Sequence, residues 1–177
     1  MAALEVVSGT KGTINLVKGV STNVVDLLRL RRTVDGYKTV NRTPVTHPTS
    51  SQLASAEKLG IDPRWVKPNG EVDWPPNYGF DGPPKIQELQ SGQTFDRYGG
   101  RFDEKGNFSD RGTFVAPRDV PFDQRSLPDS TKNSPYRQYE VLKPIPQVNS
   151  GRAASWFGKT GGGIQYQLPM SIDELLH

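Results

Sequence analysis

Apolar and polar positions alternate along three short stretches of the chain, and such alternation is typical of half-buried β-strands. In one of them Tyr139 and Val141 fall on the face opposite their polar neighbours. Two prolines, Pro144 and Pro146, follow and are expected to end that strand, because proline cannot donate a ladder hydrogen bond. The pattern predicts strands over residues 93–98, 138–142 and 164–168.

Helical spacing of apolar residues next to capping side chains marks three short segments. Each combines a small polar cap with apolar residues three or four positions apart. The expected helices are residues 24–32 after Ser21 or Thr22, a helix through Leu53, Ala56 and Leu59 between Ser50 or Ser51 and Gly60, and a C-terminal helix that starts at a capping box formed by Ser171 and Glu174.

Composition favours a loop-rich fold with short strands over a helical bundle. Only 33% of the 177 residues are hydrophobic, whereas 18 are glycine and 15 are proline. Residues 1–66 carry polar and proline-containing stretches and are expected to form an arm or linker with short helices. Residues 67–177 are expected to form the folded domain.

Several function classes lose support from the residues that the sequence lacks or misplaces. There is no cysteine, which excludes a thiolate metal site and a cysteine nucleophile, and no apolar run is long enough to span a membrane. The N-terminus lacks the apolar core of a signal peptide. His47 and His177 are poorly placed for catalysis or metal binding. The excess positive charge lies in residues 1–60 rather than in the expected domain, which argues against nucleic-acid binding.

The stretch from residue 155 to residue 166 is the strongest candidate for a ligand site. Trp156 and Phe157 precede three consecutive glycines, and Gln165 follows on the predicted strand. Glycines allow close approach of a ligand to the backbone, and the amide of a glutamine both donates and accepts hydrogen bonds. The alternative is an ordinary glycine-rich turn with a solvent-facing glutamine. The spacing matches neither a Walker loop nor a dinucleotide fingerprint.

Two arginines are further candidates for binding an anion. Arg97 shares a strand face with Phe95, so it has either an anionic ligand or an Asp–Arg pair as partner. Arg125 and Ser126 place a planar fork and a hydroxyl side by side, which suits phosphate or ribose oxygens, although a surface arginine in a turn is equally common.

Five motifs occur together in a fixed order. They are Trp74-Pro75-Pro76-Asn77-x-Gly79-Phe80, Asp96-Arg97-Tyr98-Gly99, Arg125-Ser126-Leu127-Pro128, Pro135-Tyr136 and Trp156-Phe157-Gly158-x-x-Gly161-Gly162-Gly163-x-Gln165-Tyr166. In the identity and order of these motifs, the chain resembles the TNT domain, which is named for the tuberculosis necrotizing toxin and is found at the C-termini of bacterial polymorphic toxins. The resemblance covers about residues 70–176.

The resemblance implies an α+β, mostly β fold related to the ADP-ribosyltransferases. Two small antiparallel sheets are expected to flank an NAD cleft, with short helices near both ends of the chain. It also implies an NAD(P)+ glycohydrolase, which releases nicotinamide and ADP-ribose and kills by depleting NAD. No cofactor or metal is expected, and NAD+ or NADP+ is the substrate.

Matched motif by motif, Gln165 and Arg97 fall on the family's functional glutamine and arginine. Arg125 falls on a further motif arginine. Arg137 stands where the best-known member has a functional histidine, and an arginine cannot act as a general base near neutral pH.

The roles expected from this match are as follows. Gln165 positions the ribose and the attacking water, and Arg97 binds the diphosphate together with Arg125 or Arg137, beside Ser126. The nicotinamide pocket is expected to be lined by Tyr98, Trp156 and Phe157, with Gly162 and Gly163 allowing close backbone approach.

The same resemblance implies secretion as part of a larger toxin, action in the cytoplasm of a target cell and a cognate immunity protein. Two alternatives remain open at this stage. One is ADP-ribosyl transfer to a macromolecule, which usually needs a glutamate where Gln165 stands. The other is a degenerate module that binds NAD without turning it over.

Overall fold

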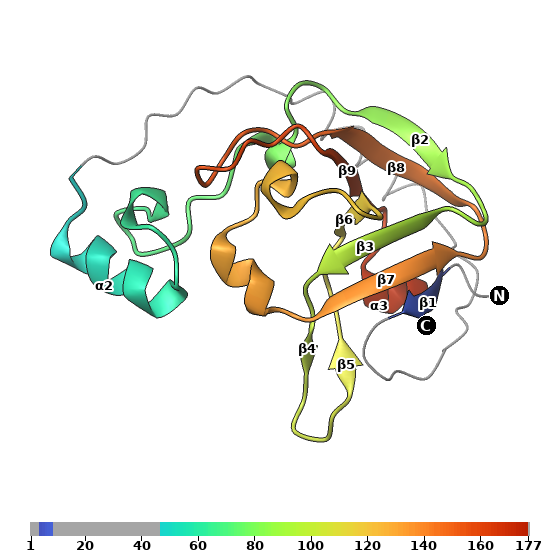
Figure 1. Cartoon of the computed structure of the whole chain (residues 1–177), viewed down its shortest axis with the longest axis horizontal. Coiled ribbons are helices and arrows are strands. Elements are labelled where there is room, and N and C mark those ends of the chain that lie inside the picture. Colours follow the sequence, from blue (N-terminus) through green and yellow to red (C-terminus); the bar gives the residue numbers. More distant parts are fainter. Residues whose placement is uncertain (1–3, 9–46, 177) are drawn as a thin grey trace.

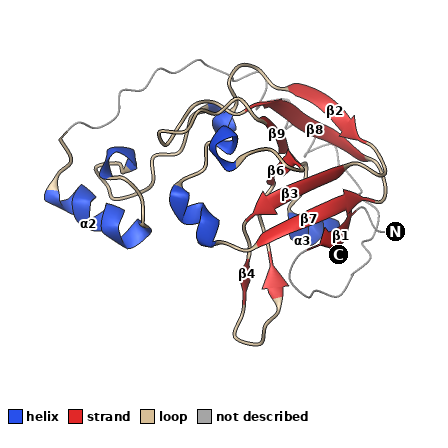
Figure 2. Cartoon of the chain, viewed as in Figure 1, coloured by secondary structure: helices blue, strands red, loops and turns tan. Residues whose placement is uncertain are grey.

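The computed structural model describes residues 4–8 and 47–176, and within them the fold is mostly β (Figures 1 and 2). The expected helix over residues 24–32 lies outside the described residues. The strands are β1 (Leu4–Ser8), β2 (Lys85–Leu89), β3 (Thr94–Tyr98), β4 (Arg101–Phe102), β5 (Phe108–Ser109), β6 (Phe114–Pro117), β7 (Tyr136–Val141), β8 (Ile145–Arg152) and β9 (Ile164–Gln167). The helices are α2 (Ser50–Leu59) and α3 (Ile172–Leu176), with short 3₁₀ turns η1 (Pro63–Trp65), η2 (Asn77–Gly79), η3 (Phe122–Arg125) and η4 (Asp129–Asn133).

Seven strands form one antiparallel sheet in the order β1-β7-β3-β6-β9-β8-β2. The short strand β6 joins its two halves, because Phe114 and Val115 pair with β9 whereas Ala116 and Pro117 pair with β3. The expected antiparallel, mostly β fold is confirmed. The two expected sheets are continuous through β6, and β4 and β5 form a separate two-stranded ribbon.

The three stretches with alternating apolar and polar residues form strands, as predicted. The strand that follows β7 was not predicted, because of its prolines. Strands β3, β7 and β9 match the three predicted strands within two residues at each end. The chain was expected to stop pairing at Pro144, yet β8 begins at Ile145 and includes Pro146. The β2–β8 register shifts between Gln87 and Leu89, beside this proline, and Gln147 has a φ of 57°. A bulge of this kind accommodates a residue that cannot donate to the ladder.

The main core lies against the inward faces of the sheet. Tyr139, Phe95 and Ile145 are almost fully buried there, together with Ile172 and Leu175 of α3. The predicted capping box of α3 is present, because the backbone of Ser171 donates to Glu174 and the backbone of Glu174 donates to Ser171.

Helix α2 begins one residue earlier than predicted. Thr49, not Ser50 or Ser51, is the cap, and its side chain forms a capping box with Gln52. Gly60 ends the helix in the left-handed conformation, as predicted. None of the helices within residues 47–176 is long and apolar enough to cross a membrane.

A second, smaller core fixes the region around α2. Trp65 packs against Trp156 and Phe157, with ring centroids 5.3 and 5.5 Å away. Strand β1 also pairs with β7 of the main sheet. The boundary between residues 66 and 67 stays a prediction, and residues from its N-terminal side contribute to the packing of the folded part.

Candidate functional site

A pocket of about 50 Å³ that is open to solvent lies where β3, β6 and β9 meet. It brings together four of the residues singled out in the sequence: Arg97, Tyr98, Arg125 and Gln165. Its other lining residues are Asp96, Phe114, Val115, Ala116, Leu127 and Ile164. Because β6 joins the two halves of the sheet, the pocket receives side chains from both halves.

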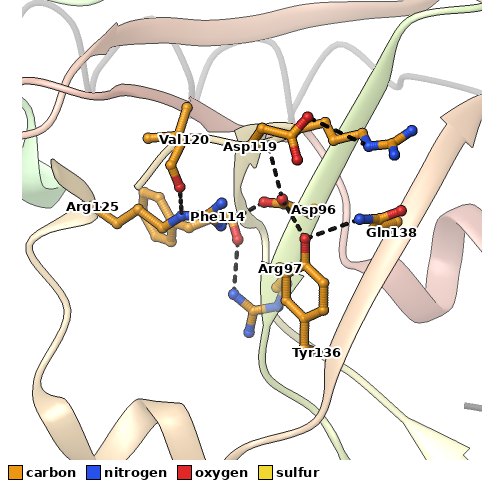
Figure 3. Close-up of polar contacts among 9 residues, drawn as sticks. Asp96, Arg97, Phe114, Asp119, Val120, Arg125, Tyr136 and Gln138 are labelled. Atoms are coloured by element: carbon orange, nitrogen blue, oxygen red, sulfur yellow. Dashed lines mark hydrogen bonds and ion pairs between the residues drawn. The ribbon is translucent and has the colours of Figure 1, made fainter. Parts of the chain in front are cut away.

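Arg97 is held rigidly at one wall of the pocket. Its Nε and Nη2 donate to the two carboxylate oxygens of Asp110 at 2.7 and 3.1 Å, and its Nη1 donates to the carbonyl of Phe114 at 2.8 Å (the last contact is drawn in Figure 3). Glycines flank the guanidinium, since a Cβ added at Gly99 or Gly112 would come within 2.6 or 1.8 Å of Nη2. The side chain nevertheless keeps 19% of its surface exposed. Of the two alternatives left open for Arg97, the structure therefore contains an Asp–Arg pair, with Asp110 as the partner.

Arg125 and Asp96 form a second, deeper ion pair. Arg125 Nη1 lies 2.5 Å from Asp96 Oδ1, and the two side chains are only 7% and 0% exposed. Arg125 Nε also donates to the carbonyl of Val120 at 2.9 Å (Figure 3). The second carboxylate oxygen of Asp96 accepts from the Tyr136 hydroxyl at 2.7 Å and from the backbone of Asp119 at 3.3 Å.

This polar cluster also affects the titration of Tyr136. Burial raises the pKa of the Tyr136 phenol, the hydrogen bond from Gln138 lowers it, and the contact with the Asp96 carboxylate raises it further. Tyr136 therefore stays protonated at neutral pH and acts as a donor to Asp96. The Asp96 carboxylate and the Val120 carbonyl both contact Arg125 and together fix the orientation of its guanidinium at the pocket.

Gln165, on β9, also lines the pocket. Its Nε2 donates to the carbonyl of Tyr78 at 2.8 Å. Tyr78 belongs to the 3₁₀ turn η2, where it and Asn77 both have a φ of 56°. The Tyr78 ring stacks on Phe114 with centroids 6.4 Å apart, so the turn contacts both β9 and β6.

Arg137 does not line this pocket. It is 7% exposed, and its guanidinium carbon lies 3.6 Å from the centroid of Phe108 and 5.7 Å from that of Phe102. In the β3–β7 ladder it pairs with Arg97. The contacts of Arg137 are thus with the β4–β5 ribbon, and its expected role in substrate binding stays a prediction.

The aromatic pair of the glycine-rich stretch also lies elsewhere. Trp156 and Phe157 are each 8% exposed and belong to the second core with Trp65. Trp156 Nε1 donates to the carbonyl of Asp73 at 2.7 Å. The expectation that these rings line the pocket has no support in this geometry, because two adjacent aromatics suit a core as well as a ligand wall.

Ser126 and the glycines shape the loops around the pocket. The Ser126 hydroxyl is buried and donates to the carbonyl of Ala154. Gly163 packs so closely that an added Cβ would lie 2.6 Å from Val120, whereas Gly162, with a φ of 85°, has open space beside it. Of these three residues only Gly162 is exposed.

Two acidic residues of the site escaped the sequence reasoning. Asp96 stood inside a quoted motif without a role of its own, and Asp110 lies in none of the quoted motifs. The signal available for Asp96 was its position beside Arg97 in that motif. Within residues 47–176 no cluster of three or more acidic or histidine side chains is placed to hold a metal ion.

Comparison with known proteins gives matches of three kinds: a family model, a relative and a solved structure. A family model described as tuberculosis necrotizing toxin matches residues 88–177. The conidial surface nicotinamide adenine dinucleotide glycohydrolase nadA of Aspergillus fumigatus is 34% identical over 128 residues, which are 68% of this chain and 53% of that protein. The chain thus spans about half the length of this relative.

The third match is a solved structure, tuberculosis necrotizing toxin complexed with its immunity factor IFT. It has 19% sequence identity and a TM-score of 0.47, over 73% of this chain and 85% of that chain. The family model covers half of the present chain and includes β3, β6 and β9, the three strands that build the pocket. The chain therefore belongs to the tuberculosis necrotizing toxin (TNT) family.

Proposed function

We propose that the protein hydrolyses the bond between nicotinamide and ribose in NAD+ or NADP+. The observation that carries this proposal is the meeting of Arg97, Arg125 and Gln165 in one pocket. The 34% identity to a nicotinamide adenine dinucleotide glycohydrolase supports it.

The reaction requires the protein mainly to position the substrate and to stabilise charge. The bond between the ribose C1′ and the nicotinamide nitrogen breaks, and its electron pair neutralises the cationic ring, so the leaving group needs no general acid. Water then adds to C1′ of the oxocarbenium-like centre and loses its proton to solvent. The products are nicotinamide and ADP-ribose, or its phosphate, and one proton.

Four of the residues that line the pocket have roles in this step. The guanidinium groups of Arg97 and Arg125 face the diphosphate, and their ion pairs with Asp110 and Asp96 hold them in place before the substrate arrives. Gln165 orients the nicotinamide ribose and the attacking water. Tyr98 lies under Arg125, whose guanidinium carbon is 5.3 Å from the ring centroid, and completes that wall of the pocket.

Gln165→Ala tests the proposal, with Gln167→Ala as a matched control. Both glutamines lie on β9, but Gln167 accepts a hydrogen bond from buried Asn149 and does not line the pocket. We expect Gln165→Ala to lower kcat by about 10²–10³-fold, as for other groups that act in the transition state. Gln167→Ala should keep its kcat and lose about 1 kcal/mol of stability. The measurement is nicotinamide release by the purified proteins. Activity of Gln165→Ala close to that of the wild type would contradict the role assigned to Gln165.

Transfer of ADP-ribose to a macromolecule is tested in the same preparation. With NAD+ labelled in the adenosine half and a cell lysate, hydrolysis leaves the label in free ADP-ribose. Label retained on protein would instead identify a transferase.

We also propose that the protein acts as a secreted toxin domain, in competition with other cells, and that a cognate immunity protein covers the pocket. An enzyme that empties the NAD pool would kill its producer unless something blocked it. The chain should therefore be toxic when expressed in bacterial cytoplasm without that protein, and harmless growth with measurable NAD+ hydrolysis would contradict the need for one.

A further inference from the structure

We propose that the turn η2 is a positioning element of the site, which orients the amide of Gln165 so that its oxygen faces the pocket as a hydrogen-bond acceptor. This inference rests on the function proposed above. The turn lies on the N-terminal side of the segment that the family model matches, residues 88–177.

The backbone of the turn is strained. Asn77, Tyr78 and Gly79 have φ values of 56°, 56° and 79°, so three successive residues adopt the left-handed conformation. Residues other than glycine rarely do so, and such strain persists only where the surroundings impose it. It is also concentrated at functional sites.

Neighbouring contacts hold this strained turn in place at both ends. Pro75 and Pro76 precede it and restrict its entry. The carbonyl of Gly79 accepts from the backbone of Ala154 at 2.7 Å, and the next residue, Phe80, bridges to Ala153. The Tyr78 carbonyl is therefore presented to β9 by a segment that cannot easily shift.

The hydrogen bond from Gln165 Nε2 to this carbonyl fixes the orientation of the amide. A carbonyl oxygen only accepts, so the amide nitrogen must face Tyr78 and the amide oxygen must lie on the other branch. Among residues 47–176 no group donates to Gln165 Oε1. The site therefore presents a fixed acceptor, which fits a donor such as a ribose hydroxyl or the attacking water.

Two glycine substitutions separate this role from ordinary backbone strain. A Cβ at Gly79 would lie 3.4 Å from Pro75 and 3.6 Å from both polar atoms of the Gln165 amide. Gly92 has a similar φ of 88°, lies in the turn between β2 and β3, and a Cβ there would meet no atom within 4 Å. Alanine at either position introduces left-handed strain, but only at Gly79 does that strain fall on the turn that carries the Tyr78 carbonyl, next to the Gln165 amide.

We expect Gly79→Ala and Gly92→Ala to lower the melting temperature by similar amounts. Gly79→Ala should lower kcat by about ten- to a hundredfold with a smaller change in KM, because a small displacement of a positioned group costs rate. Gly92→Ala should stay within about twofold of wild type, as expected away from the site. Equal kcat values for the two variants would overturn the inference.

A measurement without substrate keeps this test independent of the proposed function. In the wild type, the side-chain amide protons of Gln165 should exchange with solvent more slowly than those of the exposed Gln87, and Gly79→Ala should abolish the difference. Equally rapid exchange in the wild type would overturn the inference even if Gly79→Ala does not fold. If the wild-type protein fails to split NAD+ but protects this amide from exchange, the proposed function is contradicted and the role of the turn is not.

Discussion

The Asp96 carboxylate is the centre of the polar cluster beside the pocket. It is fully buried, and three groups depend on it: the Arg125 guanidinium, the Tyr136 hydroxyl and the backbone of Asp119. A buried ion pair adds little compared with apolar packing, but removal of one partner leaves the other charge uncompensated. We therefore infer that the ion pair serves mainly to hold Arg125 in one orientation and contributes little to the free energy of unfolding.

Substitution of Asp96 by asparagine should be strongly destabilising. The buried Arg125 would lose its counter-charge, and we expect a loss of about 3–5 kcal/mol in the free energy of unfolding. Asp119→Asn is the matched control, because its side chain is 79% exposed and its ion pair with Arg118 lies on the surface. That variant should change stability by less than about 0.5 kcal/mol. Urea unfolding measures both, and equal effects of the two variants would contradict this description of Asp96.

Strand β7 illustrates how one element serves both the sheet and its attachments. Every second residue along β7 is buried, namely Arg137, Tyr139 and Val141, and the residues between them are partly buried. Tyr139 and Val141 enter the main core, whereas Arg137 stacks on Phe108 of the β4–β5 ribbon. The ribbon is thus attached to the sheet by a cation–π contact.

Arg137→Met should loosen this attachment and leave the affinity for substrate unchanged. We expect a stability loss of about 1–2 kcal/mol from the lost cation–π contact, and faster backbone hydrogen exchange in β4 and β5. The KM for NAD+ should stay within about twofold of wild type, because Arg137 does not line the pocket. A large rise in KM without loss of stability would instead support the diphosphate-binding role expected from the sequence.

At the scale of elements, the sequence predicted what local patterns encode. The alternation around Tyr139 and the capping box at Ser171 gave β7 and α3. Strand β8 was missed because Pro146 normally ends a strand, and the bulge that accommodates it depends on pairing with β2, which lies far away in the sequence. The cap of α2 was misplaced by a single residue among adjacent hydroxyl side chains.

The candidate site was predictable in part for the same reason. Motif order placed Arg97, Arg125 and Gln165 among the candidates, and the fold brings them into one pocket. Local sequence could not tell whether Trp156 faced a ligand or a core, because that depends on Trp65, 91 positions earlier in the chain. Likewise, the carboxylate partner of Arg97 comes from Asp110, in a stretch without any pattern of its own.

At the scale of the whole molecule, the protein should lose stability in alkaline solution through the phenols of buried Tyr139 and partly buried Tyr136. Burial raises the pKa of Tyr136 and of Tyr139 above the usual value of 10.0. The folded state then holds these protons more tightly than the unfolded chain does. Their contribution to stability is complete below the unfolded pKa and is lost as the pH rises through the folded pKa.

We therefore expect the free energy of unfolding to fall between about pH 9 and pH 12, as the pH passes the usual phenol pKa of about 10. The Tyr136→Phe variant should show a shallower fall than the wild type, because it cannot ionise at that position. Urea unfolding across this range measures the slopes. Identical slopes for the two proteins would contradict a stabilising proton on Tyr136.

The place of β6 and β9 in the sheet has a consequence for how the protein is made. Arg97 and Arg125 are synthesised before Gln165, which lies on β9, and β9 connects β8 and β2 to the rest of the sheet. Domains fold as their segments emerge during synthesis. A nascent chain therefore lacks a complete pocket until β9 has been synthesised, and under the function proposed above it would be inert until then.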